Sequence, residues 1–164
     1  MDAVVFLAVT SLAAAVVLAG VPRPVDDGRD EAMRYASAVL ESYLASTLDG
    51  AFVVWTRDGR VEWLPAGPAY QVIARALLKD LEGANAMGLG PRIAGDLGLL
   101  VRSDWSFVFT ATGKNPTGRA WIPAAGGCCH PGTGADYVTA AATFRLGDAN
   151  DTAARLTLDL YPAP

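Results

Sequence analysis

The sequence predicts an α+β protein in which an N-terminal apolar helix is followed by helices packed on one face of a small antiparallel sheet. Three observations support this fold class. Residues 3–21 carry no charge, and apolar residues recur at helical spacing over 29–48 and 68–82. Near the C-terminal end, residues 138–146 and 154–160 alternate strictly between apolar and polar side chains. Such alternation predicts strands of a sheet with one buried face.

The first element is the uncharged stretch 3–21. Its nineteen residues would form a helix about 28 Å long, close to the thickness of the hydrocarbon core of a bilayer. A helix packed in a soluble core would normally show a polar stripe, which this stretch lacks. We therefore expect a transmembrane helix that is retained as a membrane anchor. A cleaved signal peptide ending near Ala19 and a buried soluble helix are the alternatives.

The chain is expected to divide into two parts at the end of this helix. The prolines within 22–24 stop the helix, because proline lacks an N–H and disfavours helix in the residue before it. Residues 1–25 would then be the anchor with its Pro-rich stop. Residues 26–164 are long enough to bury a core of their own, so we expect them to form a single α+β domain.

Within this domain the predicted elements follow one another closely. A helix over 29–48, with Gly50 as its C-terminal cap candidate, precedes a hairpin over 51–64. The hairpin is indicated by Asp58-Gly59 between two β-prone runs. A helix then starts at Pro68 and continues to about Glu82.

The second half of the domain is predicted to be mostly strand. Residues 83–98 are rich in glycine, and we expect only a short helix over 91–97. Residues 105–111 form an aromatic, alternating strand, and 119–122 form a short strand after a turn. Residues 123–134 are expected to be a loop that leads to the last two strands.

The net charge and the residues able to bind metals or catalyse reactions argue against nucleic-acid binding, metal binding and catalysis. The net charge is −4 and the basic residues are scattered, so we expect no nucleic-acid binding. Cys128, Cys129 and His130 are consecutive and cannot wrap a tetrahedral metal ion alone, although a metal shared between subunits stays open. Residues 148–159 resemble a calcium loop but place Ala153 where glycine is required, so a polar turn is the simpler interpretation. We therefore expect no catalytic, cofactor-binding or metal residues, and no enzyme.

Two modifications are candidates. Cys128 and Cys129 could form a vicinal disulfide, with a crosslink to another chain or reduced thiols as alternatives. Asn150 begins the glycosylation triplet Asn-Asp-Thr. Both features favour an extracytoplasmic domain, whereas the arginines that follow the apolar stretch favour the cytoplasm. We expect the extracytoplasmic side.

Four tryptophans lie on predicted strands, and packing in the core or at an interface is the expected role. A platform that stacks a ligand is the alternative. The four residues are Trp55, Trp63, Trp105 and Trp121.

The first 48 residues resemble pilin-type subunits, above all residues 2–7 (DAVVFL) and 40–44 (LESYL). The layout is most similar to uncharacterised small single-span proteins associated with archaeal type IV pilus-like secretion systems. The chain lacks both the basic leader before the apolar run and the glutamate near its start that major pilins carry. The resemblance therefore implies an accessory or minor subunit.

From these observations we expect a membrane-anchored, non-enzymatic accessory or structural subunit of a surface assembly. Its expected partners are membrane lipid and other membrane or filament subunits, and the sheet would offer the partner surface. A surface-tethered module that binds a small ligand is the alternative function. An enzyme ranks third.

Overall fold

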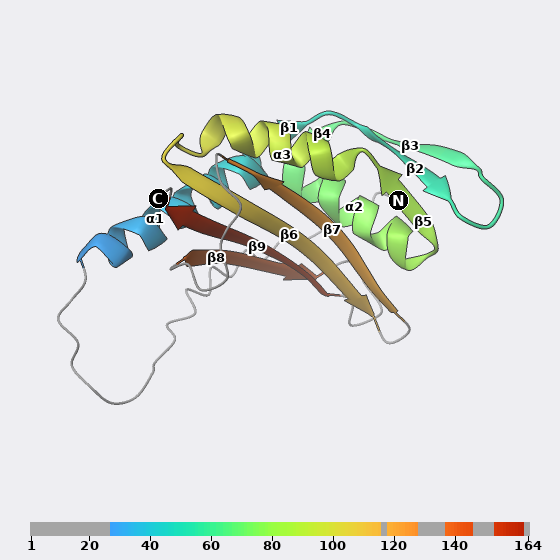
Figure 1. Cartoon of the computed structure of the whole chain (residues 1–164). Coiled ribbons are helices and arrows are strands. Elements are labelled where there is room, and N and C mark those ends of the chain that lie inside the picture. Colours follow the sequence, from blue (N-terminus) through green and yellow to red (C-terminus); the bar gives the residue numbers. More distant parts are fainter. Residues whose placement is uncertain (1–26, 116–117, 128–136, 146–152, 163–164) are drawn as a thin grey trace.

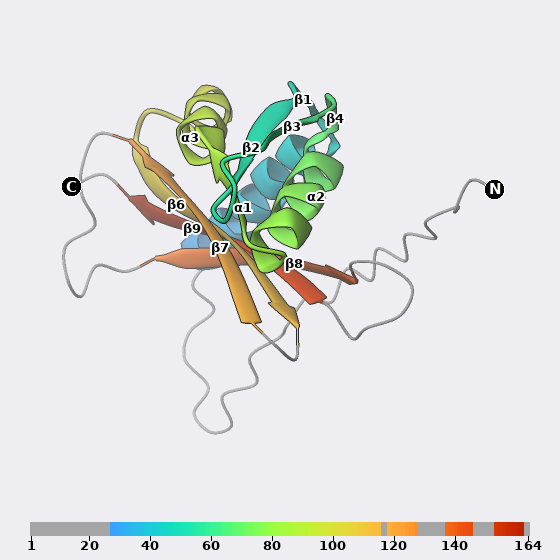
Figure 2. The same cartoon turned by 90° about the vertical axis from the view of Figure 1, so that its right-hand side faces the viewer.

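The computed structural model describes residues 27–115, 118–127, 137–145 and 153–162. Within these ranges, three helices lie on one side of a four-stranded antiparallel sheet (Figures 1 and 2). The α+β class with antiparallel pairing is thus confirmed. The described helices are all too short or too polar to cross a bilayer, and the predicted anchor, residues 3–21, lies outside the described ranges.

The strands form three sheets where the sequence predicted one. The four-stranded sheet has the order β7-β6-β9-β8, a second sheet has the order β3-β2-β5, and β1 pairs with β4 alone. The second sheet extends from the opposite side of the helices as a hairpin arm (Figure 1).

Helix α1 (Asp27–Ala45) packs its apolar stripe against β8 and β9. Its buried residues are Ala36, Val39, Leu40 and Tyr43. The helix was expected to continue to residue 48, and this was wrong. The Ser46 N–H bonds back to the carbonyls of the last turn, and Thr47–Leu48 (β1) pair with Gly67–Pro68 (β4). Gly50 is consequently not a helix cap.

The hairpin prediction is confirmed by β2 (Ala51–Trp55) and β3 (Val61–Leu64). Gly59 takes a φ of 68° in the turn, which glycine adopts without strain. On its other edge β2 pairs with β5 (Ala84–Met87), a strand that the sequence did not predict. Its four residues, ANAM, lack the β-branched and aromatic side chains that mark strands.

Helix α2 (Ala69–Leu81) closely matches its predicted bounds. Helix α3 (Leu89–Leu100) is longer than the short helix expected over 91–97. Gly88 is its N-cap residue, and a φ of 76° there lets the chain turn sharply out of β5. A side chain at Gly90 would meet the Pro123 carbonyl, so glycine allows α3 to lie directly against β7.

The four-stranded sheet is built from β6 (Trp105–Asn115), β7 (Gly118–Gly126), β8 (Val138–Arg145) and β9 (Ala153–Pro162). The predicted loop from Pro123 onward was wrong for its first four residues, which continue β7 beside β6. Proline fits here because β7 is an edge strand, where a missing N–H removes no ladder hydrogen bond. The inner faces of all four strands join the helices in one hydrophobic core, which also includes Val53 of the hairpin arm.

Candidate interaction surface

The residues that the sequence singled out lie in three different settings. Cys128, Cys129 and Asn150, together with His130, lie outside the described residues. Trp55 and Trp105 are half-buried, as core packing requires. Trp63 is 51% exposed. An exposed tryptophan on a strand needs another explanation than core packing.

Trp63 belongs to a row of large apolar side chains across the three-stranded sheet. Phe52 on β2 stands opposite Trp63 on β3 and opposite Met87 on β5. Phe52 is 55% exposed and Met87 is 65% exposed. Because side chains alternate along a strand, all three project from the same face, away from the core.

A second row extends this apolar face toward the tip of the hairpin. Val54 stands opposite Val61 on one side and Asn85 on the other. The outer face of an antiparallel sheet is normally polar. We call its five apolar residues the hairpin patch: Phe52, Val54, Val61, Trp63 and Met87.

The centre of the hairpin patch is held in place by close packing. The Trp63 and Phe52 rings lie with centroids 4.5 Å apart and planes inclined by 57°. The Trp63 ring also covers Gly50 so closely that no side chain would fit there. The two aromatic rings are therefore held in one arrangement by their own packing.

The opposite face of the hairpin is fastened to the domain. The Trp55 ring lies 4.8 Å from the Arg60 guanidinium and 5.4 Å from the Lys79 ammonium of α2. Lys79 also forms a 3.2 Å ion pair with Glu62 of β3. These contacts hold β2 and β3 against α2, so the hairpin patch has a firm base.

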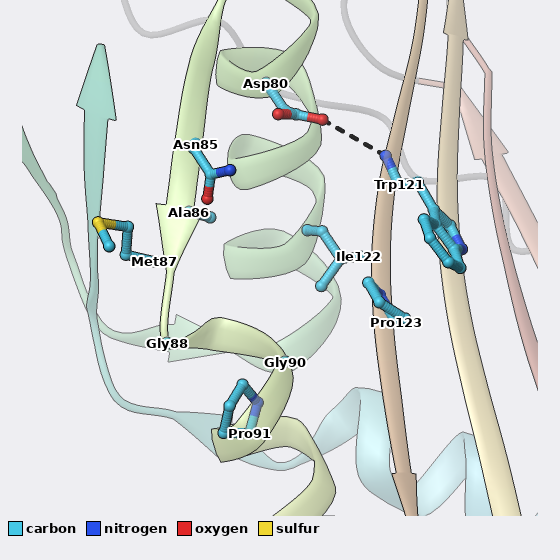
Figure 3. A pocket seen from close by; sticks show the side chains of 10 residues that line it. All are labelled: Asp80, Asn85, Ala86, Met87, Gly88, Gly90, Pro91, Trp121, Ile122 and Pro123. Atoms are coloured by element: carbon cyan, nitrogen blue, oxygen red, sulfur yellow. Dashed lines mark hydrogen bonds between the residues drawn. The ribbon is translucent and has the colours of Figure 1, made fainter. Parts of the chain in front are cut away.

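A groove of about 380 Å³ lies beside the hairpin patch, between the edges of β5 and β7 (Figure 3). Met87 lies on the β5 side of the groove, and Ile122 and Pro123 lie on the β7 side. Trp121 also contributes to the β7 side, but its 63% exposed ring is turned away from β5 (Figure 3). Asp80 of α2 and Asn85 supply polar groups at one end. The groove therefore combines apolar walls with a few polar groups, as binding pockets do.

Asp80 provides an acceptor for one backbone N–H on the free edge of β7. Its carboxylate accepts a hydrogen bond of 3.4 Å from the Trp121 backbone N–H (Figure 3). Partial burial raises the pKa of this carboxyl, and the Trp121 hydrogen bond opposes that rise. In the described ranges we find no group of three His, Cys, Asp or Glu side chains placed to hold a metal ion.

The outer face of the four-stranded sheet provides a contrast. Tyr137 and Tyr161 lie at one end of this face, and Trp121 lies on its β7 edge. The remaining side chains are mostly small or polar, as expected for a face toward water. They include Thr110, Thr112, Thr139, Thr143 and Thr157. Polar side chains thus predominate in the middle of this face, in contrast to the hairpin patch.

No protein-family profile, curated protein or solved structure matches the chain.

Sequence reasoning did not identify the hairpin patch as a site, although a signal was present. Residues 52–55 (FVVW) are apolar at every position, in both phases of the strand alternation. Only one phase can face the core of this domain, so the other phase must face water or a partner. Met87 could not be added from sequence because β5 carries no strand signal.

Proposed function

We propose that the protein is a membrane-anchored, non-enzymatic accessory or structural subunit of a surface assembly of the pilus-like or secretion type. In this proposal the N-terminal apolar segment lies in the membrane and the domain is extracytoplasmic. The hairpin patch is the surface that contacts another subunit. The single observation that supports it is the exposed row Trp63–Phe52–Met87.

The chemistry of the hairpin patch favours a protein partner over a polar ligand. Contiguous exposed apolar side chains are uncommon on soluble proteins and mark interaction sites. Tryptophan and other large side chains contribute most of the binding energy at protein interfaces. The groove beside Met87 offers room for one side chain projecting from the partner.

The patch is small, which suits a partner held in the same membrane. Five side chains cannot bury the area of a standard stable interface. Two chains anchored in one bilayer, however, meet at a high effective concentration, so weak contacts are sufficient. The resemblance of residues 1–48 to pilin-type subunits supports a partner of this kind.

Site-specific photocrosslinking in the native cells would test the proposal. A photoreactive phenylalanine analogue is placed at Phe52 or at Trp63 in the full chain. The matched control is Thr143, which lies on the polar outer face of the four-stranded sheet. We expect crosslinks from positions 52 and 63 to other single-span membrane or filament proteins, and none from position 143.

Two results would overturn the proposal. One is equal crosslinking from all three positions, which would show that the hairpin patch is not selective. The other is the absence of adducts from positions 52 and 63 in cells where the protein is abundant. Recovery of the full chain in the aqueous fraction would remove the membrane part of the proposal.

The groove supports a second candidate function, a surface-tethered module that binds a small ligand. Asp80 and Asn85 lie at one end of the groove, and Ala86, Ile122 and Pro123 supply apolar walls. Such a groove, with apolar walls and a few polar groups, suits a small ligand. A ligand that raises the melting temperature of the wild type but not of an Ala86→Phe variant, which fills the groove, would favour this function.

A further inference from the structure

One end of the domain gathers aromatic and aliphatic side chains that the hairpin patch does not include. At this end α1 and β6 begin and α3 and β9 end, on the left of Figure 1. The side chains come from α1, α3, β6 and β9 and from the residue that precedes β8. They are Tyr35, Leu99, Leu100, Trp105, Tyr137 and Tyr161. We call them the helix-entry rim.

Several members of the helix-entry rim are strongly exposed. Leu99 is 87% exposed, Tyr137 is 52% exposed and Leu100 is 41% exposed. A single exposed leucine needs no explanation, but a group of this kind at one end of a domain does.

The aromatic members are paired and held in place. Tyr35 and Trp105 have ring centroids 6.2 Å apart, and the Tyr137 and Tyr161 centroids are 5.4 Å apart. The Tyr35 hydroxyl accepts a hydrogen bond of 2.7 Å from the Arg102 backbone N–H. The rim thus presents rings with an apolar body and a polar tip, the type of side chain that is enriched where a membrane meets water.

The rim also lies at the end of the domain where α1 begins. Helix α1 starts at Asp27, and the uncharged stretch ends at Val21. The five residues between them can extend over roughly 18 Å at most. A membrane that held the anchor would therefore lie close to this end of the domain.

We infer that the helix-entry rim rests in the interface of the bilayer that holds the anchor. This inference depends on the membrane part of the proposed function. The hairpin of β2 and β3, which carries the hairpin patch, extends at the opposite end of the domain (Figure 1). Seating the rim on lipid would hold the patch away from the bilayer, toward neighbouring subunits.

Charge is not the source of this contact. Arg29, Arg34 and Arg102 lie at this end, but Glu31 and Asp104 lie there too, and Arg102 pairs with Asp104 at 2.7 Å. The rim should therefore bind neutral and anionic lipid alike, because insertion of the apolar side chains provides the attraction.

Tryptophan quenching by brominated lipid tests the inference with the full chain. None of the four tryptophans lies in residues 1–26, and Trp105 alone belongs to the rim. The protein is reconstituted into phosphatidylcholine vesicles whose acyl chains carry bromine near the headgroup. We expect quenching that is largely lost in Trp105→Phe and unchanged in Trp63→Phe.

Two variants that add a tryptophan test the inference even if Trp105→Phe disturbs the local fold. In that background, Leu99→Trp should restore quenching, whereas Thr143→Trp, on the outer face of the sheet, should not. Quenching that persists in Trp105→Phe, or its absence from vesicle-bound wild type, would overturn the inference alone. A chain that fails to float with vesicles would overturn the anchor as well.

Discussion

At the scale of single residues, Tyr43 of α1 shows how polar atoms limit stability. Its side chain is fully buried, edge-on to Phe109 with ring centroids 5.9 Å apart. Its hydroxyl finds no hydrogen-bond partner among the described residues, and burial strongly raises the pKa of this group. An unsatisfied buried hydroxyl destabilises a fold.

We therefore predict that Tyr43→Phe raises the free energy of unfolding by about 1 kcal/mol. The matched control is Tyr35→Phe, because the Tyr35 hydroxyl does accept a bond from Arg102. That control should lower the free energy of unfolding by a similar amount. Urea unfolding of both variants measures the difference, and a loss of stability in Tyr43→Phe would show that its hydroxyl has a partner.

Asp80 gives a pH-dependent prediction. Burial raises the pKa of its carboxyl above 3.8, so the folded chain holds this proton to a higher pH than the unfolded chain does. The free energy of unfolding must then fall as pH rises from the unfolded pKa through the folded pKa. Asp80→Asn removes this dependence and keeps an acceptor for the Trp121 N–H.

The variant should therefore match or exceed the wild type in stability at neutral pH. Its advantage should vanish below the unfolded pKa, where both side chains are uncharged. Melting temperatures across this range measure the difference, with Asp58→Asn at the hairpin turn as the exposed control. An advantage that grew as the pH was lowered would contradict the assigned direction of the pKa shift.

At the scale of elements, sequence reasoning worked where one strong local pattern was present. The alternation of β8 and β9, the Asp58-Gly59 turn and the stripe of α2 all predicted the observed elements. It failed for β5, and for β7 after Pro123, because partners distant in sequence stabilise these segments. Strand β5 is paired by β2, and the end of β7 by β6. The hairpin patch could not be assembled from sequence because Met87 is on β5.

The length of helix α3 was underestimated because glycines interrupt its sequence. Gly95 and Gly98 lie inside the helix, and a side chain at either would meet no atom within 4 Å. Each glycine should therefore weaken the helix without any packing benefit. We predict that Gly98→Ala raises the free energy of unfolding by about 0.5–1 kcal/mol.

Gly50→Ala is the contrasting variant within the same chain. A methyl group there would run into the Trp63 ring and the Leu64 carbonyl. Overpacking of this type destabilises by about 1–3 kcal/mol. Chemical denaturation of the two variants should show opposite signs, and equal effects would mean that Trp63 does not pack over Gly50.

At the scale of the whole molecule, the described residues form one core. Buried side chains of all three helices and of the two larger sheets contact each other in a single cluster. The described residues between 27 and 162 therefore share one continuous hydrophobic core, and residues 1–26 lie outside the described part of the chain. In the proposed function, folding and membrane attachment are properties of separate parts of the chain.

We predict from this separation that a chain lacking residues 1–26 folds in water with one cooperative transition. Far-UV and near-UV circular dichroism should give coincident melting curves, as two-state unfolding requires. The full chain should float with vesicles while the shortened chain should not. If the shortened chain were molten or insoluble, the apolar segment would have to belong to the core, and the anchor would be an incorrect interpretation of residues 3–21.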